Sequence, residues 1–148
     1  MKVILTYLIL ILGFDLSFIV LLKVDIIPLQ NLEDIVSCGL LGGIGGVAYC
    51  LRGVYLNACV RKSWDKDWLP WYFIRPIVSH ICGAISYIFL RGGLLVLEAE
   101  PAAVSTNMGF LALAFIAGLN VDKFISKIED VAQATWGIEK SRTSKREE

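Results

Sequence analysis

VILTYLILILGFDLSFIVLL (residues 3–22) carries one charged residue, Asp15. At about 1.5 Å per residue, a helix over this stretch is about 30 Å long, which matches the hydrocarbon core of a bilayer. Three more apolar stretches of similar length follow at residues 35–56, 76–97 and 101–121, and most charges fall between them. In lipid a helix satisfies its own backbone hydrogen bonds. The pattern predicts an all-α, polytopic membrane protein with four transmembrane helices.

The composition agrees with a membrane protein. Of 148 residues, 56% are apolar and 19% are charged, which is too apolar for an ordinary soluble domain of this size. Lys plus Arg and Asp plus Glu each total 14, so net charge indicates no partner. The first apolar run has no small-residue cleavage site after it, which favours an uncleaved span over a signal peptide. The four cysteines lack metal-ligand spacing and are expected to be small buried thiols.

Basic residues gather in the loop between the second and third spans and in the C-terminal tail. The positive-inside rule places both on the cytoplasmic side, and with four spans the N-terminus lies there too. Residues 122–137 keep apolar side chains at helical spacing and predict a cytoplasmic amphipathic helix that continues the fourth span. It would pack against other subunits or lie on the membrane surface. Residues 138–148 are polar and are predicted to be disordered.

The second loop and the helix ends beside it combine basic and aromatic residues. Tryptophan rings favour the boundary between lipid and water, where they anchor helix ends. Pro76 predicts the start of the third helix, because a first turn leaves its N–H groups unpaired in any case. We expect this surface to be either the cytoplasmic mouth of an oligomer or the contact surface of a protein partner. Its residues are Arg52, Arg61, Lys62, Trp64, Trp68, Trp71 and Arg75.

Glycines recur along the second span at helical spacing. Helices meet closely at glycines, which matters in lipid because no hydrophobic force drives them together. The contact could join subunits or line a pore, or it could pack the helices of one bundle, and the sequence leaves both readings open. The residues concerned are Gly39, Gly42, Gly43 and Gly46.

Polar residues within the spans are the strongest indication of function, because an unpaired charge at that depth is costly. Counted from the span midpoints, Asp15, Arg91 and Asn107 share one depth on the outer side. We therefore expect an Asp15–Arg91 pair, completed by Asn107, that acts as a structural latch or as part of a polar pathway. His80 is expected in the inner half of the third span, either as a proton-sensitive gate or as a neutral packing residue.

Three segments together resemble a pattern in small uncharacterised bacterial membrane proteins. They are GGIGGVAYCLRGVY, DKDWLPWYFIRPIVSHICGAISYIFLRGGLL and FLALAFIAGLNVDKF. The resemblance covers about residues 42–124 and implies a four-span protein of the bacterial inner membrane, without any established chemistry. Size and topology are also similar to those of four-span subunits of bacterial phage-defence systems, a likeness that supplies no residue roles.

Two functions compete. The first is a homo-oligomeric channel or pore, in which several copies surround an axis, because four spans alone are too few to enclose a wide path. The second is a non-conducting membrane anchor or sensor that recruits a cytoplasmic protein through the second loop and the C-terminal helix. No nucleophile–base pair or metal-ligand set stands out, so we expect no enzymatic activity and no cofactor. We expect contacts with membrane lipids and no direct binding of nucleic acid.

Overall fold

The computed structural model describes residues 1–24, 32–93 and 106–139. Within these ranges the chain has five α-helices and no β-strand, which confirms the all-α prediction. A π-helical turn, Leu56–Val60, prolongs the second helix, and a 3₁₀ turn, Lys66–Trp68, precedes the third. The helices are α1 (Lys2–Lys23), α2 (Glu33–Tyr55), α3 (Leu69–Arg91), α4 (Thr106–Leu119) and α5 (Val121–Trp136).

Three helical segments are each long and apolar enough to cross a membrane. They contain α1, α2 with its π-helical turn, and α3 with the 3₁₀ turn before it, and they have 22, 28 and 26 residues. The helix α4 has 14 residues and is about 21 Å long, shorter than a hydrocarbon core. It meets α5 at a bend of 111°, and the two together form a fourth candidate span. The start of the predicted fourth span and the end of the third lie outside the described residues.

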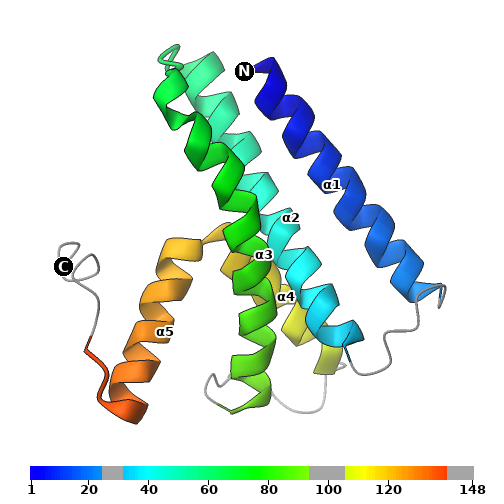
Figure 1. Cartoon of the computed structure of the whole chain (residues 1–148), viewed down its shortest axis with the longest axis vertical. Helices are drawn as coiled ribbons and strands as arrows, with labels where there is room; N and C mark the ends of the chain where they lie inside the picture. Colours follow the sequence, from blue (N-terminus) through cyan, green and yellow to red (C-terminus); the bar gives the residue numbers. More distant parts are fainter. Residues whose placement is uncertain (25–31, 94–105, 140–148) are drawn as a thin grey trace.

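The helix α2 is the centre of the bundle. It packs against α1, α3 and α4. Within its most apolar stretch of 18 residues, 56% is buried, compared with 17% for the corresponding stretch of α1. In Figure 1, α1 runs down, α2 runs up and α3 runs down, so the N-terminus lies beside the connection between α2 and α3. At this end Ile4 and Leu8 pack with Val54 and Tyr72. The helix α1 is therefore a peripheral helix held along one side of the core.

Glycines allow the three core helices to meet backbone to backbone. A Cβ atom added to Gly42 would lie 2.7 Å from the Cα atom of Gly83 on α3, and one added to Gly118 on α4 would overlap the carbonyl group of Gly42. Added at Gly45, a Cβ would overlap the backbone at Phe115. Among the described residues, this glycine seam of α2, α3 and α4 is thus filled by helices of the same chain.

The start of α3 differs from the prediction. The helix begins at Leu69, with Pro70 in its first turn, and Pro76 lies inside it. Pro70 fits there because a first turn does not need its N–H group. The earlier start moves the midpoint of α3 to His80 and makes Arg91 its last residue. Arg91 therefore stands at the end of α3 and not within it.

The helix α5 is not a straight continuation of α4. The chain turns sharply after Leu119, and α5 runs back beside the second half of α3 (Figure 1). Its Val121 and Phe124 pack against Cys82 of α3 and Ala117 of α4. The apolar face predicted for residues 122–137 therefore packs, at Phe124, against helices of the same chain.

Candidate functional site

A polar pair, with Asp15 buried and His80 partly exposed, joins α1 to α3 near the middle of both helices. The Asp15 side chain is fully buried, and its Oδ1 atom lies 3.0 Å from Nε2 of His80. The other ring nitrogen, Nδ1, lies 2.8 Å from the carbonyl oxygen of Pro76. The imidazole ring occupies the space that a side chain at Gly43 would fill, so glycine at this position of α2 lets the ring reach Asp15.

His80, and not Arg91, is the partner of Asp15. The Asp15–Arg91 pair expected from the sequence does not form, because Arg91 ends α3 and is exposed, whereas His80 stands at the level of Asp15. The apolar pattern of the sequence placed the start of the third helix at residue 76, seven residues later than in the structure. Depths counted from that start put Arg91, and not His80, at the level of Asp15. The side chain of Asn107 lies outside the described residues, so its predicted part in the pair stays a prediction.

A second polar cluster lies where α5 begins. Arg75 of α3 is buried, and its Nη1 atom donates a hydrogen bond to Oδ2 of Asp122 over 2.8 Å. The guanidinium also stands over the rings of Tyr49 and Trp71, 4.8 and 5.5 Å from their centroids, in cation–π geometry. One turn further along α3, the hydroxyl of Ser79 lies 3.0 Å from the carbonyl oxygen of Gly118. These contacts fix the sharp turn between α4 and α5 against α3.

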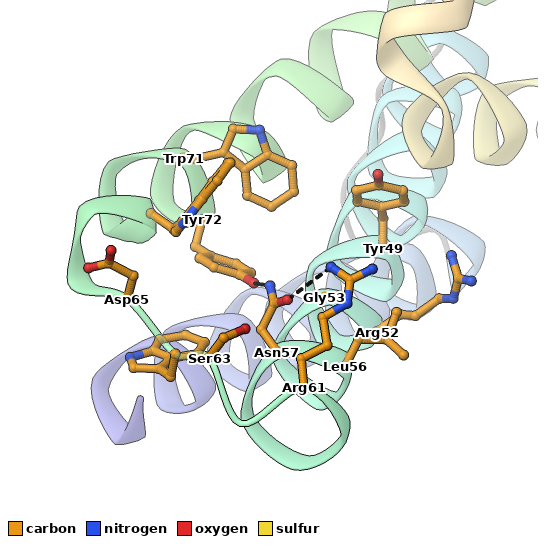
Figure 2. A pocket seen from close by; sticks show the side chains of 12 residues that line it. Tyr49, Arg52, Gly53, Leu56, Asn57, Arg61, Ser63, Asp65, Trp71 and Tyr72 are labelled. Atoms are coloured by element: carbon orange, nitrogen blue, oxygen red, sulfur yellow. Dashed lines mark hydrogen bonds between the residues drawn. The ribbon is translucent and has the colours of Figure 1, made fainter.

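A hollow of about 540 Å³ opens at the end of the bundle where α2 connects to α3 (Figure 2). This volume lies within the usual range of small-ligand sites, about 300–1,000 Å³. The lining comes from the last turns of α2, the connection and the first turn of α3. The lining residues are Tyr49, Arg52, Gly53, Leu56, Asn57, Arg61, Ser63, Trp64, Asp65, Trp68, Trp71 and Tyr72.

One wall of the hollow is an aromatic stack. The rings of Trp64 and Tyr72 stack with centroids 5.6 Å apart, and Trp71 meets Tyr72 edge-on at 5.0 Å. The amide of Asn57 donates a hydrogen bond to the Tyr72 hydroxyl over 3.3 Å and accepts one from Arg61 over 3.5 Å. The stack and the amide thus fix the side chains of this wall relative to one another.

Five of the seven residues predicted for the basic, aromatic surface line this hollow. They are Arg52, Arg61, Trp64, Trp68 and Trp71. Lys62 lies outside it, and Arg75 is buried behind the aromatic rings. Sequence reasoning missed Asn57, which carries no charge and falls within the π-helical turn. It also missed Asp122 as the partner of Arg75, although both residues stand where an apolar run meets a polar one.

The four glycines singled out from the sequence have different neighbours within the chain. Gly42 meets Gly83, Gly43 meets the His80 ring and Gly46 meets the Ser79 side chain, in each case too closely for a Cβ atom. A Cβ atom at Gly39 would find ordinary contacts, 3.5 Å from the carbonyl oxygen of His80. Packing within one bundle thus accounts for glycine at Gly42, Gly43 and Gly46, whereas Gly39 has room for a methyl group.

The cysteines and acidic residues form no further site among the described part of the chain. Cys38, Cys50 and Cys82 are buried free thiols, as expected, whereas Cys59 is exposed on the π-helical turn. Within the same residues, no three His, Cys, Asp or Glu side chains come together as a metal site would require. The two candidate sites are thus the Asp15–His80 pair and the hollow at the α2–α3 end.

Comparison with known proteins gives no relative. No protein-family model, no curated protein and no solved structure matches the chain. The resemblance of residues 42–124 to small bacterial four-span membrane proteins therefore stays a prediction.

Proposed function

We propose that this chain is a non-conducting membrane subunit that binds a ligand or partner at the α2–α3 end, in the manner of an anchor or sensor. The observation that carries the proposal is the hollow, in which five of the predicted surface residues come together around one space. Ligand sites are typically concave and largely preformed, with a few polar groups that fix orientation. The hollow has this character, with guanidinium, amide and aromatic groups facing one cavity.

The packing of the glycines supports a subunit that completes its own core. Close helix contacts through small residues are a common way to associate in lipid. Here the closest of these contacts, at Gly42, Gly45 and Gly118, are made within the chain. A second copy is therefore not needed to cover the glycine seam, which was the sequence feature that favoured an oligomer.

The cavities of the described residues also support a non-conducting chain. The hollow and a shallow cavity beside Lys2 and Phe73 both lie at the α2–α3 end. A small cavity beside Lys23 and Asp34 lies at the opposite end. Within the described ranges, the residues that line the first two cavities are not shared with the third. None of these three cavities joins the two ends of the bundle.

The alternative is a homo-oligomeric pore, and it would have to use surfaces other than the glycine seam. Four further statements stay predictions from the sequence. They are the cytoplasmic termini, the bacterial inner membrane, a cytoplasmic protein partner and a part in phage defence. Under the proposal, the partner would meet the hollow and the C-terminal helix, as the sequence predicts.

Ion flux across reconstituted liposomes tests the proposal. The purified full chain is incorporated at several copies per vesicle, and release of K⁺ and of a small anionic dye is measured with protein-free vesicles and a channel-forming peptide as references. We expect release at the rate of protein-free vesicles, at neutral pH and at pH 5. Selective release that scales with the amount of protein would overturn the proposal and favour the pore.

A further inference from the structure

The hollow has an excess of positive charge that the described residues leave without a counter-ion. Arg52 and Arg61 both line it, and neither forms an ion pair with a carboxylate in the described part of the chain. The one acidic lining residue, Asp65, already accepts a hydrogen bond from the backbone N–H of Asp67 over 3.1 Å. Two guanidinium groups thus offer donors to whatever enters.

Arg61 is oriented by a neighbour and keeps most of its donors free. A guanidinium has five N–H donors in a planar fork, and Arg61 uses one of them, on Nη1, for Asn57. Figure 2 shows this guanidinium between Asn57 and Tyr49, with Arg52 at the outer edge of the group. Planar, paired donors match the oxygens of a phosphate group better than a single ammonium does.

The position of the hollow indicates where such a group would come from. It lies at the ends of two long apolar helices and is bordered by Trp64, Trp68 and Trp71. Tryptophan rings concentrate at the depth of lipid headgroups. Its volume of about 540 Å³ leaves room for more than a bare phosphate ion, so a phosphate ester with an organic remainder fits it.

We propose that this hollow binds a phosphate-bearing anion, an inference that rests on the proposed function. Arg61 and Arg52 bind the phosphate oxygens, and the Trp64–Tyr72 stack packs against the organic remainder. The phosphate can belong to the headgroup of an anionic phospholipid or to a soluble phosphate. Both sources share the same chemistry, and an experiment with two arms separates them.

The test uses the full chain in maltoside micelles, which contain no phosphate. In the first arm, native mass spectrometry counts adducts with phosphatidylglycerol and with diacylglycerol, which lacks the phosphate. In the second arm, tryptophan fluorescence follows a titration with inorganic phosphate. The variant Arg52→Gln/Arg61→Gln is compared with Lys62→Asn/Lys66→Gln, which removes the same charge at the same end of the bundle but outside the hollow. Asn suits position 62 because Lys62 has a φ of 51°.

The expected result is binding that depends on the two arginines. Charge-assisted hydrogen bonds are strong enough that their loss weakens binding roughly tenfold or more, whereas the control variant should bind like the wild type. Adducts with phosphatidylglycerol alone assign the site to a lipid headgroup, and saturable binding of inorganic phosphate assigns it to a soluble phosphate. Equal binding by both double variants, or no phosphate-dependent binding in either arm, would overturn the inference. Either result leaves the flux test of the proposed function unaffected, so the two can fail separately.

Discussion

Oδ1 of Asp15 and Nε2 of His80 lie 3.0 Å apart between α1 and α3. The other contact of the His80 ring shows how many protons this hydrogen bond contains. The Nδ1 atom of His80 faces the carbonyl oxygen of Pro76, which can only accept, so Nδ1 carries a proton. The contact with Asp15 therefore contains one proton, donated either by a carboxylic acid or by an imidazolium. In both cases the pair has no net charge, which suits helices that are long and apolar enough to cross a membrane.

Substitution of Asp15 tests whether this pair holds α1 on the core. Ala at position 15 leaves Nε2 of His80 without its partner and should cost about 1–3 kcal/mol. Asn keeps a donor in nearly the same place and should lose less. Thermal unfolding in detergent and cross-linking between α1 and α3 measure the effect. Wild-type stability for both variants would show that the pair does not secure α1.

The glycine seam predicts which glycines tolerate a methyl group. Gly118→Ala and Gly42→Ala place a Cβ atom against backbone and should destabilise the chain by about 1–3 kcal/mol through overpacking. Gly13→Ala meets nothing within 4 Å and should be neutral or slightly stabilising, because Ala is the better helix former. Melting temperatures of the three variants in one detergent decide the matter. Equal melting temperatures would contradict the packing described for α2, α3 and α4.

Loss of the carboxylate at Asp122 should loosen α5. Arg75 is 6% exposed and its Nε atom has no partner, whereas Asp122 is 74% exposed. Asp122→Asn thus leaves a buried guanidinium without its carboxylate, at a cost of roughly 1–3 kcal/mol, less than for a fully buried pair. Hydrogen–deuterium exchange should accelerate across residues 121–136.

Lys127→Gln on the same helix is the control for that exchange measurement. It changes the charge of α5 without touching the ion pair, so exchange should stay at the wild-type rate. Exchange that is equally fast in both variants would mean that the contact with Arg75 does not fix α5.

The apolar runs were enough to predict α1 and α2 to within a few residues. The first run lies between Lys2 and Lys23 and the second follows Asp34, and the burial needed in lipid permits few alternatives. The start of α3 was missed because both Pro70 and Pro76 can open a helix, and local sequence does not say which does. That difference of one and a half to two turns decided whether His80 or Arg91 would stand opposite Asp15.

The candidate sites depended on contacts that sequence spacing does not contain. The surface residues of the second loop were identifiable because Arg and Trp gather there, and most of them line the hollow. Their organisation by Asn57 and Tyr72 was not, because it requires the tertiary approach of α2 and α3. The bend after Leu119 was likewise not predictable, since the pairing of Arg75 with Asp122 spans 47 residues.

Native mass spectrometry of the full chain, released from maltoside micelles, tests most directly whether one chain completes its own glycine seam. The account predicts a single species of 16.4 kDa, the mass of one chain, over a wide range of protein concentration. A defined ring of three or more copies that persists on dilution would contradict it and would favour the homo-oligomeric pore.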